Sequence, residues 1–211
     1  MARRSSAAAR RWARLILGLW LFAAGTFMTI ESRLGLSPWD VLNDGLSRRT
    51  PLSFGTAVIL VGVVLVVGTT MAGMRPGPGT ITNMLLIGVF IDVLLALDIT
   101  SGASTWPYWA RIVVTVAGIV LVGLGTALYI GAGMGAGPRD GLMVLIATRA
   151  RMRVGVARAL VEGTAFITGA LLGGRLGVGT VLFALGIGPA VDIWFQVFGM
   201  DSSGRRPAPT V

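Results

Sequence analysis

Six long apolar segments, separated by short polar stretches, dominate the chain of 211 residues. Each is close to the ~20 residues that a helix needs to cross ~30 Å of hydrocarbon. Glycine is frequent inside them, as it is in membrane helices whose backbones approach closely. The pattern therefore predicts an all-α, polytopic membrane helix bundle. The expected spans are Trp12–Ile30, Phe54–Gly73, Thr80–Leu97, Arg111–Ile130, Val154–Leu172 and Val178–Phe198.

The second half of the chain repeats the first with a shift of 100 residues and no gap. Residues 11–98 and 111–198 share 24 identities in 88 aligned pairs, among them Pro38 with Pro138 and Asp40 with Asp140. Biased composition would align scattered Gly and Leu, but not Pro, Asp and Arg in one register. We therefore predict two pseudo-symmetric tandem repeats, 12–98 and 111–198, joined by a linker over residues 99–110.

The first apolar segment has a second interpretation. Arg10 and Arg11 precede it, and Ala23-Ala24-Gly25 lies near its end, as in a cleavable signal peptide. Because this segment is the repeat partner of the fourth span, we predict that it is itself a span. Residues 1–11 then form a basic cytoplasmic tail, and residues 199–211 a polar C-terminal tail.

A short insert of mixed polarity lies between the first and second spans of each repeat. The inserts Pro38–Ser47 and Pro138–Ala147 would each be ~15 Å long as helices, which is half a bilayer. As half-length helices they leave three spans per repeat and make the repeats inverted, an architecture typical of secondary transporters. If each insert crossed fully, the repeats would be parallel. We favour the inverted arrangement, because Asp40, Asn43 and Asp44 would be costly in a lipid-facing span.

The composition excludes several classes of protein. Hydrophobic residues make up 54% of the chain and charged residues only 13%, against about 25% in soluble domains. The 18 basic residues are all arginine, and His, Cys and Lys are absent. Thiolate nucleophiles, imidazole bases and Cys or His metal sites are therefore excluded. We expect no enzymatic activity, no cofactor and no metal ion.

The net charge of +9 has a topological interpretation. The arginines flank apolar segments in short clusters, which favours the positive-inside rule over nucleic-acid binding. Counting them places the N-terminus in the cytoplasm, whether each repeat has three spans or four. The arginine-, alanine- and glycine-rich composition suggests a bacterial cytoplasmic membrane. The cluster Arg149, Arg151 and Arg153 is expected at the cytoplasmic interface, in contact with anionic lipid headgroups.

Two pairs of repeat-related carboxylates are candidate binding residues, because an ionisable group inside a span costs ~2.5–3.5 kcal/mol. Asp92 and Asp192 lie near the ends of the third spans, where they either bind a cation or proton between the repeats or cap a neighbouring loop. Asp40 and Asp140 occupy the third positions of the inserts. There they either complete a capping box or join the free N–H groups of the helix in binding a ligand.

Three further charged residues break the symmetry of the repeats. Arg139 replaces Trp39 beside Asp140, where it binds an anion or neutralises its neighbour. Arg158 and Glu162 are spaced i, i+4 in the fifth span, whereas the first repeat has Val and Gly at those positions. An ion pair is the simplest account of the two. Asymmetric charge on a symmetric scaffold also makes them candidates for substrate coupling.

Several motifs resemble the YczE/YyaS/YitT-type family of bacterial membrane proteins over about residues 12–198. The resemblance implies a multi-span membrane protein and brings no mechanism with it. The motifs are Gly35-Leu-Ser-Pro38-Trp-Asp40, Leu52-Ser-Phe-Gly55-Thr56, Gly135-Ala-Gly-Pro138-Arg-Asp140-Gly141-Leu142-Met143, Arg158-x-x-x-Glu162 and Gly177-x-Gly179-Thr180.

The sequence thus favours a permease for a small molecule or ion, with its site where the two repeats meet. The alternative is a membrane accessory or scaffold protein that supports another complex. A homodimer is compatible with either function. Substituting Glu162 by Gln distinguishes them, because a permease should lose activity while staying folded and a scaffold should be unaffected.

Overall fold

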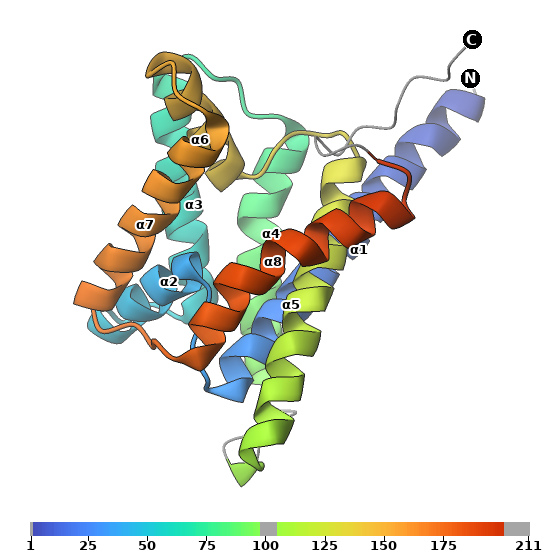
Figure 1. The fold of residues 1–211 in the computed structure, drawn as a ribbon. Helices are drawn as coiled ribbons and strands as arrows, with labels where there is room; N and C mark the ends of the chain where they lie inside the picture. The colour runs from blue at the N-terminus through green and yellow to red at the C-terminus, as the bar shows by residue number, and fades with distance from the viewer. Residues whose placement is uncertain (1, 98–104, 201–211) are drawn as a thin grey trace.

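The computed structural model describes residues 2–97 and 105–200, and eight α-helices run through them (Figure 1). Six helices are long and apolar enough to cross a membrane, and two are short, as the sequence predicts. The long helices are α1 (Ala2–Ser32), α3 (Phe54–Met71), α4 (Pro78–Ala96), α5 (Tyr108–Gly131), α7 (Val154–Leu171) and α8 (Val178–Val197). The short helices are α2 (Pro38–Arg49) and α6 (Pro138–Arg149).

The largest departure from the expected boundaries is at the start of the chain. The basic segment 1–11 is already helical from Ala2, because its alanines favour helix and extend α1 beyond the apolar segment. Residues 98–104 of the predicted linker and residues 201–211 of the predicted C-terminal tail lie outside the described residues.

Proline starts both short helices, at their first position, where its missing N–H costs no hydrogen bond. Each has 12 residues, which is ~18 Å and too short to cross the bilayer. The helix boundaries of the two halves also correspond, since α2, α3 and α4 begin 100 residues before α6, α7 and α8.

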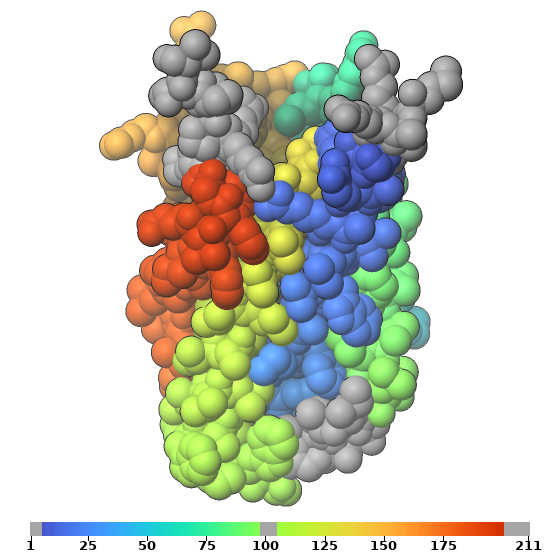
Figure 2. Space-filling view, turned by 90° about the vertical axis from the view of Figure 1, so that its right-hand side faces the viewer, coloured from blue at the N-terminus to red at the C-terminus, as the bar shows by residue number. Residues whose placement is uncertain are grey.

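Helices α1 and α5 form an antiparallel pair that lies side by side over most of their lengths (Figure 2). Glycines make this contact possible. A Cβ added at Gly25 would lie 2.5 Å from the carbonyl oxygen of Gly118, and one at Gly125 would lie 2.6 Å from that of Gly18. The two backbones therefore touch twice along the crossing, at positions that correspond between the halves.

Arginines fasten both ends of this pair. The Arg11 Nε donates to the carbonyl of Ala132 at 2.9 Å, at the end of α5. The Arg111 Nε donates to the carbonyl of Ser32 at 2.7 Å, at the end of α1. The bundle thus has an N-terminal end, where α1 begins and α5 ends, and a linker end, where α1 ends and α5 begins.

The short helices finish at opposite ends of the bundle. The Arg49 Nε donates to the carbonyl of Leu172 at 3.1 Å, and the α7–α8 loop is joined to the linker end by the hydrogen bond from Gly179 N to Leu34 O. The Arg149 Nη2 donates to the carbonyl of Ala72 at 2.6 Å, in the α3–α4 loop at the N-terminal end.

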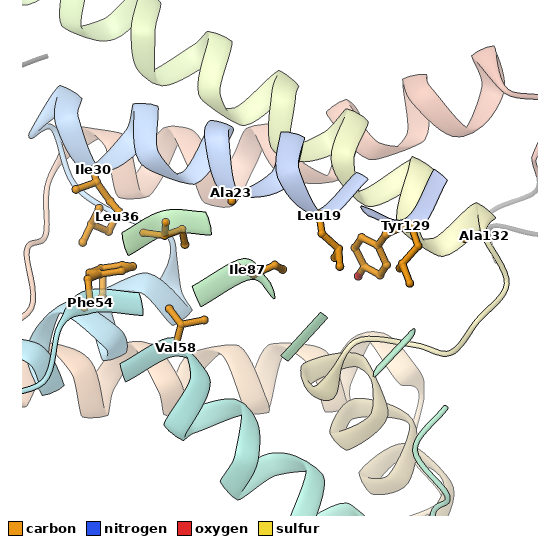
Figure 3. Close-up of a cluster of buried hydrophobic side chains, with 12 residues drawn as sticks. Leu19, Ala23, Ile30, Leu36, Phe54, Val58, Ile87, Tyr129 and Ala132 are labelled. Atoms are coloured by element: carbon orange, nitrogen blue, oxygen red, sulfur yellow. The ribbon is translucent and has the colours of Figure 1, made fainter. Parts of the chain in front are cut away.

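The main apolar core joins α1 to α3 and α4 (Figure 3). Its buried side chains are labelled there along the inner face of α1 and at the start of α3. Tyr129 and Ala132, at the end of α5, belong to the same core, so it also ties α5 to the first half of the chain. The labelled members include Leu19, Ala23, Ile30, Leu36, Phe54, Val58 and Ile87.

The two halves differ in how tightly their last two helices are packed. Helix α3 packs along α4, whereas α7 and α8 diverge from their connecting loop and make no comparable contact (Figure 1). In the most apolar stretches, 39% of α3 and 44% of α4 is buried, against 22% of α7 and 17% of α8. The second half is therefore open where the first is closed.

Candidate functional site

A cavity of about 320 Å³ lies at the centre of the bundle, and each of the helices α1–α8 contributes to its walls. Six of the seven candidate residues line it, although they come from four different helices. They are Asp40, Arg139, Asp140, Arg158, Glu162 and Asp192. Asp92 does not line the cavity.

The short helices α2 and α6 both begin at this cavity. Ser37 caps α2, because its Oγ accepts a hydrogen bond from the backbone N–H of Asp40 at 3.1 Å. The same hydroxyl donates to the Asp40 carboxylate, which is 4% exposed. The predicted capping motif is therefore present. Gly137 replaces Ser37 at α6, where no side chain caps the helix, so its first N–H groups have no side-chain cap.

Asp140 is held by a residue that the sequence analysis did not single out. The hydroxyl of Tyr129, on α5, donates to the Asp140 Oδ2 at 3.1 Å. Tyr129 is 6% exposed, and its ring packs edge-on against Phe22 at a centroid distance of 6.5 Å. The hydroxyl is thus fixed in direction by the packing of the ring, and it fixes the carboxylate in turn.

Arg139 lies against the residue that it replaces in the repeat. Its guanidinium carbon is 4.9 Å from the centroid of the Trp39 ring, a cation–π distance. The pair bridges the starts of α2 and α6, at positions that are 100 residues apart in the chain. The Trp39 Nε1 is buried and makes no hydrogen bond with any residue that the structure describes.

The i, i+4 ion pair predicted on α7 is present. The Arg158 Nε is 2.9 Å from the Glu162 Oε1, with side chains 53% and 31% exposed. Both residues line the cavity, where the first half has only Val58 and Gly62. Helix α7 therefore contributes one positive and one negative charge to the cavity wall.

The two repeat-related aspartates of the last spans have different surroundings. Asp192 on α8 is exposed to the cavity and has no hydrogen bond or ion pair with the described residues. Asp92 on α4 accepts hydrogen bonds from the Ser53 hydroxyl and from the backbone N–H of Gly55 at 2.7 Å. Its contacts are those of the capping interpretation, at the start of α3.

Among the further polar residues of the cavity that sequence reasoning missed are Tyr129 and Asn83. Both lie inside apolar helices, where an uncharged polar side chain is itself a signal. A search for charge alone passes over them.

The cavity combines four carboxylates with two guanidinium groups, aromatic rings and the start of an uncapped helix. Such a set of groups suits a small charged or zwitterionic solute, which would find a partner for either sign. Among the described residues, no group of three acidic side chains is arranged to hold a metal ion.

Comparisons with known proteins give a consistent group of bacterial relatives. A family of unknown function, DUF6198, matches residues 9–196. An uncharacterized protein of Haemophilus influenzae is 34% identical over 183 residues, covering 87% of this chain and 82% of the relative. The uncharacterized membrane protein YczE of Bacillus subtilis is 39% identical over 182 residues, covering 83% and 80%. The uncharacterized protein YyaS of Bacillus subtilis is 27% identical over 167 residues, covering 79% and 83%. No solved structure matches the chain.

Proposed function

The chain belongs to DUF6198, a family of unknown function, and on that premise we propose that it is a permease for a small charged solute or ion. The matches to YczE and YyaS confirm the resemblance that the motifs indicated. With its long apolar helices and its relationship to a protein named as a membrane protein, the chain is a multi-pass membrane protein. Its bacterial relatives favour the bacterial cell membrane as its location.

One observation carries the proposal: six charged candidate residues line a single cavity at which two half-length helices begin. Helix starts that point at a central site are a recurring feature of secondary transporters. A protein that only anchors a complex needs no such groups in its interior, where charge is costly. The likeness to transporters is one of architecture, so the function is argued from the cavity itself.

The antiparallel α1–α5 pair and the 100-residue correspondence support inverted repeats. Equivalent helices of the two halves would then run in opposite directions across the bilayer, with the cavity between them. The arginine distribution supports a cytoplasmic N-terminal end. In that orientation the gap between α7 and α8 opens to the cytoplasm, and the arginines at 149, 151 and 153 lie at the cytoplasmic headgroups.

Uptake into proteoliposomes tests the proposal. The probes are monovalent cations, polyamines and the common amino acids, which between them offer single and multiple positive charges, zwitterions and, in the acidic amino acids, a net negative charge. We expect at least one probe to be taken up by the wild type, and Glu162→Gln and Asp140→Asn to abolish that uptake while the protein stays folded in detergent. Glu31→Gln is the matched control, because Glu31 does not line the cavity.

An accessory protein would give the opposite result. No probe would be taken up, and Glu162→Gln would leave the phenotype of the cell unchanged. If Glu31→Gln loses uptake as Glu162→Gln does, the loss comes from general damage to the protein and not from the change in the cavity.

A further inference from the structure

The start of α3 and the end of α4 are held together by one carboxylate. Asp92 accepts a hydrogen bond from the backbone N–H of Gly55 at 2.7 Å and another from the Ser53 hydroxyl. Helix starts attract carboxylates, because their first N–H groups have no partner within the helix. We name this contact the Asp92 clasp, and it closes the linker end of the bundle between α3 and α4.

Two glycines allow the helices to meet beside the clasp. A Cβ added at Gly55 would overlap the carbonyl oxygen of Gly88, and one at Gly88 would overlap that of Gly55. The backbones therefore touch, and no other residue type fits either position while the clasp is closed.

The equivalent residues of the second half are all present but apart. A Cβ at Gly155 or at Gly188 would meet nothing within 4 Å. Asp192 faces the cavity without a hydrogen bond among the described residues, and no side chain caps the start of α7. Two glycines and an aspartate are thus in contact at the linker end, between α3 and α4. The equivalent two glycines and aspartate are apart at the N-terminal end, between α7 and α8.

We propose that Asp192 closes on the start of α7 in a second conformation, as Asp92 closes on α3, and that the two clasps alternate. This inference rests on the proposed permease function and gives it a gate at each end. In the present conformation the linker end is closed and the N-terminal end is open. Exchange of the clasps would expose the same cavity to the other side of the membrane.

The chemistry of the second clasp favours its formation. Arg153 stands where the first half has Ser53, so a closed Asp192 would gain an ion pair as well as the N–H group of Gly155. Helix α8 can bend toward α7, because Pro189 lies within it, directly after Gly188. Proline removes one backbone hydrogen bond and is a common cause of bends in helices. Helix α4 has Val89 at that position.

Accessibility of one cysteine to a membrane-impermeant maleimide tests the clasps without any transported solute. The chain contains no cysteine, and Ala184→Cys places a reporter in the cavity wall on α8. In sealed vesicles of known orientation, the reporter should label from the N-terminal side. Adding Asp92→Asn should raise labelling from the linker side by about tenfold, since lost hydrogen bonds to a charge shift a two-state equilibrium by that order.

A glycine pair supplies the matched control. Gly188→Val fits the present conformation but prevents closure of α8 on α7, so it should cancel the effect of Asp92→Asn. Gly163→Val should leave the effect of Asp92→Asn on labelling unchanged. Gly163 also faces open space, and the equivalent residue of the closed half is already Val63. Ser53→Ala is a milder substitute for Asp92→Asn should the latter fail to fold.

The proposal is overturned if neither Asp92→Asn nor Ser53→Ala changes the side of labelling, or if Gly188→Val and Gly163→Val behave alike. If the side of labelling changes but no probe is taken up, the two clasps are supported and the permease function is contradicted. If a probe is taken up but the side of labelling does not change, the permease function is supported and the alternating clasps are contradicted.

Discussion

The guanidinium of Arg139 lies 4.9 Å from the centre of the Trp39 ring, so two residues at equivalent positions of the two halves are in direct contact. In a symmetric pair of repeats, such a contact forms on the axis that relates them. Here the two positions hold one cation and one aromatic ring rather than two identical residues. The asymmetry gives the centre of the cavity a positive group beside the carboxylates Asp40 and Asp140.

Replacement of Arg139 should therefore affect function more than stability. Arg139→Gln loses a cation–π contact of about 0.5–2 kcal/mol but leaves the short helices in place. We expect solute uptake to be lost and the melting temperature in detergent to fall only slightly. Arg10→Gln, which removes an exposed arginine outside the cavity, serves as the control. Uptake that is equal in the two variants would mean that Arg139 takes no part in the site.

The inverted arrangement predicts opposite labelling of Arg49→Cys and Arg149→Cys. Arg49 is bound to the carbonyl of Leu172 at the linker end, and Arg149 to that of Ala72 at the N-terminal end. An impermeant maleimide should reach the two cysteines from opposite sides of the membrane. Arg10→Cys should label from the same side as Arg149→Cys. If positions 49 and 149 labelled from one side, the repeats would be parallel and the transporter likeness would lose its main support.

The helix boundaries could be predicted from the sequence because their signals are local. Phe54 and Val154 begin helices where the apolar segments were expected to start, and Pro38 and Pro138 begin the short helices. Charges in apolar surroundings were equally informative, since six of the seven candidates line one cavity.

The contacts made across helices could not be predicted in the same way. Tyr129 meets Asp140 only because α5 and the start of α6 fold back on each other, which no local pattern encodes. Gly88 and Gly188 are the same residue in equivalent surroundings of sequence, yet one is packed and the other open. The local sequence around each glycine therefore does not specify which of the two is packed against a neighbouring helix.

Asp44 is a structural residue, and its loss should be costly. Its carboxylate, 5% exposed, accepts hydrogen bonds from the backbone N–H of Arg175 at 2.8 Å, from the Arg175 Nη2 at 3.0 Å and from the Arg48 Nε at 2.9 Å. These contacts fasten the α7–α8 loop to α2. Asp44→Asn should lower the free energy of unfolding by about 2–3 kcal/mol, less than for a fully buried pair because Arg175 is partly exposed.

Denaturant titration in detergent measures this loss. Arg48→Gln is the control, since its side chain is 50% exposed and a surface pair contributes less than about 1 kcal/mol. Equal losses in Asp44→Asn and Arg48→Gln would show that the buried contacts to Arg175 contribute little, contrary to the geometry.

The α1–α5 crossing should tolerate no side chain at Gly25. A Cβ there would lie 2.5 Å from the carbonyl oxygen of Gly118 and 2.7 Å from the backbone nitrogen of Val122. Backbone atoms of a helix cannot move aside as a side chain can, so Gly25→Val must separate the two helices. We expect a loss of about 3 kcal/mol or more in the free energy of unfolding. Gly68→Val makes the same change on α3, where a Cβ meets nothing within 4 Å, and should alter stability by less than about 0.5 kcal/mol. Comparable melting temperatures for the two variants would contradict the close crossing, because only Gly25 lies between two backbones.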